Sequence, residues 1–571
     1  MLNSITRAGL LCLLAMSPAL LPAQTPPTGP ATQEIATQEE SVTFKSKVNL
    51  VLVPVVVRDK AGKPVPNLRQ QDFQLFDKGK AQIITRFSIE TAGGKAIARA
   101  PELDLTPEEK AALAGAPAVI APDHFVAFLF DDIHISFGDL VAVREGAEKH
   151  IANLKSTDRV AIFSTSGQTT LDFTDDRNQI HDTLLKLRPR PVARNTVQEC
   201  PDISYYMSDL IVNRNNQLAL NAAAAEALIC ANLPDMQSAI SMAQGTAYRV
   251  LGSGEQETRV AMYSLKDVVR RMALMPGQRT IVFASPGFIR LNDQLQDETG
   301  IIDQAIRSSV TISTLDARGL YTGQPDISKR VVSFQAEQLK RQYDHEADNA
   351  NADILAELAD GTGGAFVQNT NDLARGFREL SAAPDVYYVL GFSPQNLKLD
   401  GSYHPLRVTV KIPPGLSPKA RRGYYAPRHL SSADEDAREE ISQALFSREE
   451  MRDIPIDIHT QFFKSNEAEA KLGVVTRVDV RKLHFRKADG RNVNDVEIVT
   501  ALFDRNGNIQ QTVSKILKMK LLDATLATKV NNGLAVRCDF KVSPGMYVIR
   551  LVVRDAEGQM MAAQNAAVEI P

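Results

Sequence analysis

The stretch HFVAFLFDDIHISFGDL, residues 124–140, decides the fold of the central part of this chain. Its first seven residues form a continuous apolar run, which is typical of a strand that a sheet buries on both faces. Apolar residues then recur at steps of three and four, which predicts an amphipathic helix; they are Leu140, Val143, Ala147, Ile151 and Leu154. The polar residues between the run and the helix therefore form a strand-to-helix loop.

The alternation of strand and helix continues along the chain. Further buried strands are expected in RVAIFSTS (159–166), RTIVFASPGF (279–288) and TISTLDARGL (311–320), with helical patterns between them. A long, less regular helical segment at about 191–253 interrupts the alternation as an insertion. Strands that alternate with helices predict an α/β fold with a doubly wound, mostly parallel sheet.

Period-two patterns and turn residues predict β structure on both sides of this α/β part. An N-terminal β segment is expected over 44–92, followed by a polar connector over 93–121. The α/β domain is expected over 122–428, and a charged helical link over 429–452. Residues 453–571 contain about seven short strands, which fits an immunoglobulin-like β-sandwich.

The N-terminus predicts export. Arg7 precedes the apolar run AGLLCLLAMSPALLPA, and this arrangement is typical of a secretory signal peptide, here assigned to 1–23. The run is short and interrupted by proline, so the alternative of an uncleaved membrane anchor fits it less well. A Pro/Thr/Gln-rich flexible leader is expected over 24–43. We therefore expect a periplasmic, cell-envelope or secreted protein with no membrane span in the mature chain.

Cysteine usage agrees with an oxidising compartment. Outside the predicted signal peptide the chain has Cys200, Cys230 and Cys538. The first two lie in the helical insertion and are expected to form a disulfide, worth roughly 3–4 kcal/mol in the chain-entropy model. Cys538 alternates with apolar residues of LAVRCDFKV and is expected to be a small buried side chain.

Several polar residues are expected at one edge of the central sheet. In open α/β sheets, ligands bind at the carboxyl ends of the strands. Asp131, His134 and Ser285 follow two of the predicted strands and are expected to line a binding rim there. A second interpretation applies to Ser136, because Ser136 and Asp139 have the spacing of a helix capping box.

An ordered set of segments supports a family resemblance. The segments are DKAGKPVPNLRQQDFQLFDKGK, FLFDDIHISFGDL, DRVAIFSTSGQTTLDFTDDR, ECPDISYYMSDLIVN, TIVFASPGF, TLDARGL, TGGAFVQNTNDL and YYVLGFSP with DGSYHPLRVTV and ARRGYYAP. Over roughly residues 44–428 they resemble the VWFA-related proteins of the acidobacterial type. The resemblance implies a von Willebrand factor A-like core in an exported protein. A-domain proteins in general bind other proteins, often through a metal at this rim.

The resemblance also implies a site for Mg²⁺ or another divalent cation. A domains carry D-x-S-x-S on this loop, and such hard cations prefer oxygen ligands. The matching residues Asp132 and Ser136 are the expected metal ligands, with Thr174 as a third and Thr196 as its alternative. His134 stands at the middle hydroxyl position, and a proline replaces the Asp of the usual Thr/Ser-Asp-Gly loop. The implied metal site is therefore degenerate.

Enzyme motifs are missing from the sequence. There is no G-x-S-x-G, HExxH, P-loop or CxxC pattern, and a net charge of -3 gives no reason to expect nucleic-acid binding. We therefore predict a non-enzymatic protein that binds another protein or a cell-envelope component at the carboxyl edge of its sheet. The alternatives are a hydrolase that uses Ser285, His134 and Asp132 on one rim, and a metal-free structural envelope component.

Overall fold

The computed structural model describes most of the chain from residue 34 onward. The described ranges are 34–40, 51–59, 64–91, 96–98, 119–120, 122, 124–155, 157–191, 200–291, 294–320, 334–382, 386–394, 402–411, 416–426, 433–446, 450–558 and 560–570. The predicted signal peptide lies outside them. Among the described residues, no helix combines the length and apolar character needed to cross a membrane.

A six-stranded sheet forms the centre of the molecule, in the order β10-β9-β8-β11-β12-β13. All neighbours are parallel except β10, which runs antiparallel to β9. All seven side chains of β8 are buried, as its continuous apolar run predicts. The strands are β8 (His124–Phe130), β9 (Asp158–Ser164), β10 (Thr170–Thr174), β11 (Gln278–Ser285), β12 (Val310–Asp316) and β13 (Phe366–Val367).

Helices cover both faces of this sheet, so the predicted doubly wound fold class is confirmed. Alternate side chains of β8 point to opposite faces. Phe128 packs with α2 (Phe137–Ile151), α3 (Arg177–Leu184) and α9 (Leu373–Ser381). Leu129 packs on the other face, where the covering helices are α6 (Met236–Met272), α7 (Leu295–Arg307) and α8 (Phe334–Thr362).

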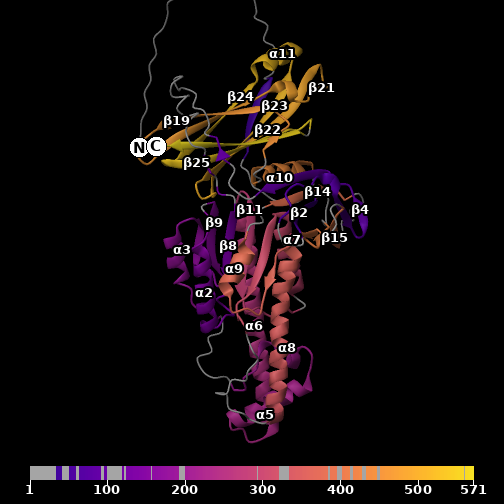
Figure 1. Cartoon of the computed structure of the whole chain (residues 1–571), viewed down its shortest axis with the longest axis vertical. Helices are drawn as coiled ribbons and strands as arrows, with labels where there is room; N and C mark the ends of the chain where they lie inside the picture. The colour runs from indigo at the N-terminus through magenta and orange to yellow at the C-terminus, as the bar shows by residue number, and fades with distance from the viewer. Residues whose placement is uncertain are drawn as a thin grey trace, which may run out of the picture.

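The predicted insertion forms a helical projection beyond the carboxyl edge of the sheet, at the lower end of the molecule in Figure 1. It consists of α4 (Tyr205–Val212), α5 (Gln217–Cys230), the first half of α6 and the start of α8. Its own core contains Met207, Ala223, Ala243 and Tyr343. Because α6 and α8 both continue without a break from this core onto the sheet, two helices join the projection to the α/β domain.

The N-terminal β segment does not stand alone. It shares two four-stranded sheets, β16-β2-β14-β5 and β17-β15-β3-β4, with strands that follow the α/β domain. These strands are β2 (Val51–Arg58), β3 (Phe73–Asp77), β4 (Lys80–Gln82), β5 (Arg86–Thr91), β14 (Val386–Phe392), β15 (Tyr403–Val410), β16 (Ser417–Ala420) and β17 (Gly423–Tyr425). A 3₁₀ turn, Gln70–Asp72, precedes β3, and two fragments of the predicted connector pair as β6 (Ala96–Ile97) and β7 (Val119–Ile120).

The predicted domain boundary of 122–428 is therefore wrong at its C-terminal end. β14 pairs antiparallel with β2 and β5 and does not join the parallel sheet. Its buried residues Tyr388 and Leu390 pack in the same core as Val53 and Val55. Tyr388 also accepts a hydrogen bond from the amide of Leu68 (3.1 Å) and donates one to a backbone carbonyl, which ties the two segments together.

The C-terminal part is a β-sandwich, at the top of Figure 1. A seven-stranded antiparallel sheet packs against the three-stranded sheet β19-β20-β24, and Cys538 is buried between them as predicted. Helix α10 (Ala433–Phe446), within the predicted link, covers the outer face of the larger sheet. The remaining elements are β18 (Met451–Arg452), β19 (Ile456–Lys464), β20 (Ala470–Val478), a 3₁₀ turn at Val480–Lys482, β21 (Arg486–Ala488), β22 (Arg491–Asp504), β23 (Ile509–Leu521), α11 (Asp523–Asn532), β24 (Leu534–Val542), β25 (Gly545–Asp555) and β26 (Met560–Ile570).

The predicted flexible leader contains a strand. β1 (Ile35–Glu40) pairs antiparallel with the edge strand β23 of the sandwich. The side chains of residues 36 to 39 are all exposed, so the side-chain pattern gave no signal for burial. Backbone pairing at an open sheet edge needs no apolar face, which explains why composition alone predicted a flexible segment.

Candidate functional site at the carboxyl edge of the sheet

Loops from three neighbouring strands meet at the carboxyl edge, and backbone hydrogen bonds join them. Asp131, directly after β8, donates its amide proton to the carbonyl of Ala284 at the end of β11 (2.9 Å). Thr165, directly after β9, donates to the carbonyl of Phe130 (3.0 Å). The polar residues that follow the strands are thereby brought together, as the sequence predicts for this edge.

Asp131 is the centre of the site. Its carboxylate is fully buried and accepts hydrogen bonds from Ser285 Oγ (2.6 Å), Thr165 Oγ1 (3.0 Å) and His134 Nδ1 (2.9 Å). Burial alone would raise the pKa of this carboxyl group. The charge and hydrogen bond of His134, with the two hydroxyl donors, outweigh burial and hold the pKa of Asp131 below its ordinary value of 3.8.

Asp132 is equally buried and bonded to a different set of donors. Its Oδ1 accepts from the amide of Ser166 (2.8 Å) and from Thr165 Oγ1 (3.0 Å). Its Oδ2 accepts from Ser166 Oγ (2.6 Å). The hydroxyl of Thr165 thus lies between the two carboxylates and links them.

His134 lies against the loop that follows β11. Its ring stacks on Phe288, with the ring centres 5.1 Å apart and the planes at 25°. Burial lowers the pKa of His134, but the carboxylate of Asp131, and more weakly Glu257, more than offset this, so that the pKa is raised above 6.5. A carboxylate can only accept, so Nδ1 of the imidazole is the donor in the bond to Asp131.

Ser136 is a helix cap. Its Oγ accepts from the amide of Asp139 (3.2 Å) at the start of α2 and donates to the Asp139 carboxylate (2.8 Å). The capping interpretation is therefore the one that the structure shows for Ser136.

Thr174 does not join the other predicted residues. It lies on β10 opposite Val160, near the beginning of β9, and its hydroxyl accepts from the amide of Asp176 (3.1 Å). Because β10 runs antiparallel to β9, the end of β10 points away from the carboxyl edge. Thr174 was expected at the rim only because the resemblance implies a threonine ligand, and the direction of this short edge strand could not be read from the sequence. The alternative, Thr196, lies outside the described residues.

The residues present do not fit a divalent cation. The oxygens of Asp132 and the hydroxyl of Ser136 are already bonded to donors of the chain, and Thr174 is remote. In the described part of the chain, no three or more His, Cys, Asp or Glu side chains gather as a metal-binding group. The polar groups of the D-x-H-x-S loop therefore bond to other groups of the chain.

The geometry also differs from that of a serine hydrolase. Ser285 Oγ donates to Asp131 and accepts from the amide of Gly287 (2.9 Å), and Ser285 is fully buried. His134 binds the same carboxylate, so Asp131 lies between the serine and the imidazole. A nucleophilic serine needs the base at its own hydroxyl, and this arrangement places a carboxylate there.

Two residues of the site were missed by the sequence analysis. Thr165 and Ser166 end the segment RVAIFSTS and supply the donors for both aspartates. The available signal was their position directly after a buried strand, at the same edge as Asp131. Asp316, the last residue of β12, is also buried at this edge and pairs with Arg318 (2.7 Å), which in turn pairs with Asp348 (2.9 Å).

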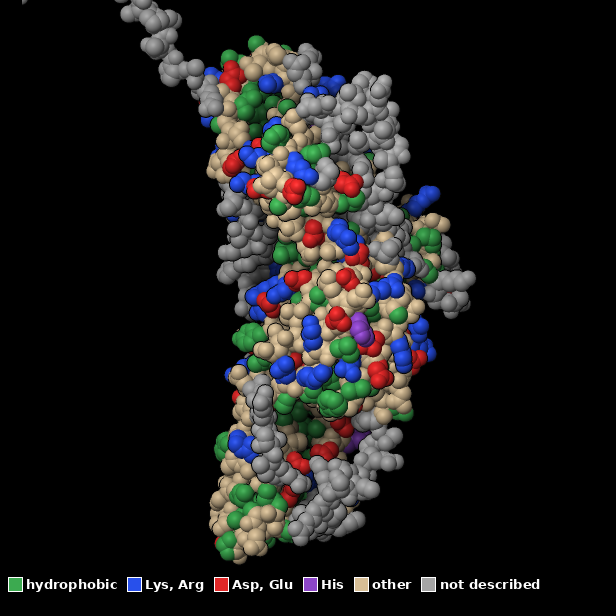
Figure 2. Space-filling view, turned by 90° about the vertical axis from the view of Figure 1, so that its left-hand side faces the viewer, with side chains coloured by type: hydrophobic (Ala, Val, Ile, Leu, Met, Phe, Trp, Pro, Cys, Tyr) green, Lys and Arg blue, Asp and Glu red, His purple; other side chains and the backbone are tan. Residues whose placement is uncertain are grey.

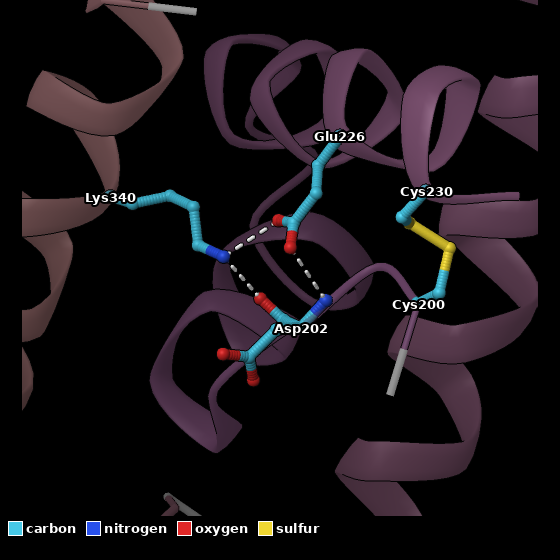
Figure 3. The surroundings of a disulfide bond; sticks show 5 residues. All are labelled: Cys200, Asp202, Glu226, Cys230 and Lys340. Carbon is cyan, nitrogen blue, oxygen red and sulfur yellow. Dashed lines mark hydrogen bonds and ion pairs between the residues drawn. A yellow bond between two sulfur atoms is a disulfide. The ribbon is translucent and has the colours of Figure 1, made fainter. Parts of the chain in front are cut away.

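A disulfide and an ion pair hold the far end of the helical projection together, near the turn between α5 and α6. The predicted disulfide between Cys200 and Cys230 is present, with a Cα–Cα distance of 5.8 Å. Figure 3 shows the neighbouring contacts, in which Lys340 Nζ of α8 binds Glu226 Oε2 of α5 (2.6 Å) and the carbonyl of Asp202 (2.7 Å). The segment before α4 is thus fixed to two helices.

Large apolar side chains are exposed on the projection. Leu218 and Ile229 of α5 are 61% and 44% exposed, and Met236 and Tyr248 of α6 are 47% and 64% exposed. Since α5 and α6 form an antiparallel hairpin, Ile229 and Met236 lie near its turn, and Leu218 and Tyr248 lie nearer the sheet. On the face drawn in Figure 2, hydrophobic side chains gather at this lower end, whereas acidic and basic side chains are interspersed over the body above it.

Comparisons with known proteins give only distant similarities. No protein-family model matches the chain, and no curated protein is detectably similar to it. Among solved structures, the conserved hypothetical protein BatB from Bacteroides thetaiotaomicron is similar at 12% identity over 44% of this chain and 95% of its own, with a TM-score of 0.22. The pilus adhesin SpaC from Lactobacillus rhamnosus GG is similar at 7% identity over 90% of this chain and 48% of its own, with a TM-score of 0.22. The type V pili tip protein Mfa5 from Porphyromonas gingivalis is similar at 10% identity over 86% of this chain and 78% of its own, with a TM-score of 0.18.

Proposed function

We propose that this chain is an exported, non-enzymatic binding protein that engages another macromolecule through the helical projection at the carboxyl edge of its central sheet. The observation that carries the proposal is the exposed apolar set Leu218, Ile229, Met236 and Tyr248 on that projection. Large apolar side chains exposed along one helical hairpin are costly in water, and exposed apolar surface commonly marks interaction sites.

The construction of the projection supports a recognition role. The disulfide and the ion pair of Lys340 with Glu226 hold its helices together, so little conformational entropy would be lost on binding. Tyrosine and methionine, both present in the exposed set, are enriched in protein interfaces. The resemblance to VWFA-related proteins points to the same edge, because A-domain proteins bind other proteins there.

Export is supported by the disulfide. Stable disulfides form in oxidising compartments, and the bridge between Cys200 and Cys230 agrees with the predicted signal peptide. We therefore propose a partner in the cell envelope or outside the cell, with a protein favoured over a nucleic acid because the net charge is -3.

Site-specific photo-crosslinking tests this proposal. A photoreactive phenylalanine analogue placed at Tyr248 or Leu218 should link the protein to a macromolecule in intact cells. The matched control is the same analogue at Phe463, which is 71% exposed on β19 of the sandwich. Adducts from the projection and none from Phe463 would support the proposal. Adducts from neither position would favour the structural alternative, and adducts from Phe463 alone would place the partner on the sandwich.

A further inference from the structure

We infer that donors of the chain itself, centred on Asp131, hold the carboxyl edge together in place of a bound divalent cation. His134, Thr165 and Ser285 are these donors, and the edge needs no metal to fold. This inference concerns the architecture of the rim and does not depend on the identity, or the existence, of a binding partner.

The first support is that the bonds around Asp131 connect separate loops. His134 lies in the loop after β8, and Thr165 lies in the loop after β9. Ser285 is the last residue of β11. Each donates a side-chain hydrogen bond to the one buried carboxylate, at 2.9, 3.0 and 2.6 Å. A cation at a rim joins loops in the same manner, by gathering ligands from several strand ends around a single charge.

The second support is that donors of the chain already occupy most acceptor positions of the two carboxylates. A carboxylate has about four lone-pair positions. Asp131 accepts from the three side chains named above and also from the backbone amide of His134 (3.3 Å). Asp132 accepts from both the amide and the hydroxyl of Ser166, and it shares the single hydroxyl proton of Thr165 with Asp131. An incoming cation would have to displace donors in a site that has no water-exposed carboxylate.

The third support is the residue at the middle of the loop pattern. A domains have a serine there, and this chain has His134, whose ring lies between Asp131 and Phe288. The imidazole donates to Asp131 and also stacks on Phe288, a contact that a hydroxyl side chain cannot make. The following hydroxyl, of Ser136, is used as a helix cap and not as a ligand.

Thermal unfolding of the full chain with and without metal tests the inference. Wild-type protein should melt at the same temperature in EDTA and in about 0.1–10 mM Mg²⁺ or Mn²⁺. A cation that bound the folded chain with a dissociation constant below these concentrations would raise the melting temperature. His134→Ser should lower the melting temperature of the α/β domain by at least about 3 °C, because it removes a buried donor. His181→Ser, at an exposed position of α3, is the matched control and should leave the melting temperature unchanged.

Thr165→Val provides a second, nearly isosteric variant if His134→Ser does not fold. It removes only the shared hydroxyl, and it should also lower the melting temperature in EDTA. The inference is overturned if wild-type protein gains stability with increasing Mg²⁺ or Mn²⁺. It is also overturned if removal of the internal donors leaves the melting temperature at the wild-type value. A failure of these tests would leave the crosslinking result for the projection unaffected, so the two proposals can fail separately.

Discussion

At the scale of single residues, Asp131 organises the carboxyl edge, and its removal should be costly. Asp131→Ala leaves two buried side-chain donors, of His134 and Ser285, without their acceptor, while Thr165 keeps Asp132. We expect a loss of about 2–4 kcal/mol in the free energy of unfolding. Urea unfolding followed by circular dichroism measures it, because the chain has no tryptophan.

The matched control for this change is Asp139→Ala on the same loop. Asp139 is half-buried and bonds only to the cap Ser136 among the interactions described above. Its loss should cost about 1 kcal/mol or less. Equal losses for the two variants would contradict the central role of Asp131.

His150 gives the molecule a pH dependence away from the candidate site. It lies at the end of α2, where its ring packs edge-on against Phe128 and bonds to Ser381 of α9 (2.6 Å). Burial lowers the pKa of His150 to about 4, with Arg378 and His124 acting in the same direction and Asp158 opposing them. Between pH 6.5 and 4 the unfolded chain therefore binds more protons at this residue than the folded chain does.

The contribution of His150 to stability should be present above pH 6.5 and lost as the pH falls towards 4. The loss should be on the order of 1–3 kcal/mol. His150→Gln should reduce the change in the melting temperature of the α/β domain between pH 6.5 and pH 4. His345→Gln, at an exposed position on α8, is the control. A wild-type slope that survives in His150→Gln would assign the pH dependence to other groups.

The sequence predicted the place of a residue in the fold where that place depends on its position along a strand. Asp131, Asp132, His134 and Ser285 were expected at one edge because they follow buried strands, and the structure places them there. Asp131, His134 and Ser285 were also expected to line a binding rim, but Asp131 and Ser285 are fully buried. Their roles could not be predicted, because which donors surround a carboxylate depends on contacts between distant segments. Thr165 and Ser166 were missed for this reason.

At the scale of elements, the periodicity of the sequence identified the central sheet and its helices. Continuous apolar runs became the parallel strands, and steps of three and four became α2 and α3. The partners of β14 and β1 could not be predicted, because a period of two shows that a strand is half-buried but does not say which sheet it joins. Both strands pair with segments hundreds of residues away.

Two glycines of α6 offer a matched test of how the projection is packed. At Gly254 a Cβ atom would collide with the ring of Tyr205 from α4, whereas at Gly252 it would meet no atom within 4 Å. Gly254→Ala should therefore separate α4 from α6 and destabilise the projection by about 1–3 kcal/mol. Gly252→Ala should stabilise the same helix by about 0.5–1 kcal/mol.

Hydrogen exchange of α4 and α5 amides measures both glycine variants at once. Faster exchange in Gly254→Ala and slower or unchanged exchange in Gly252→Ala is the expected result. Similar behaviour of the two variants would mean that α4 does not rest on α6 at this glycine.

At the scale of the whole molecule, the sandwich and the helical projection lie at opposite edges of the central sheet (Figure 1). The turn at Gly507 of the sandwich packs on Phe125, at the start of β8, where a Cβ atom would collide with the ring. Asp175 pairs with Arg159 (3.2 Å) and with Arg505 of the sandwich (3.0 Å) at that same end. The sandwich therefore leaves the carboxyl edge and the projection uncovered.

The central claim is that the carboxyl edge is built from internal hydrogen bonds and takes no divalent cation. Crystals of the full chain grown with Mn²⁺ test it most directly, by anomalous diffraction at the manganese absorption edge. The account predicts no anomalous peak at this edge, with Ser136 Oγ still on the Asp139 amide and His134 on Asp131. A peak within about 2.2 Å of an Asp132 oxygen, a normal distance for a hard divalent cation, would contradict it.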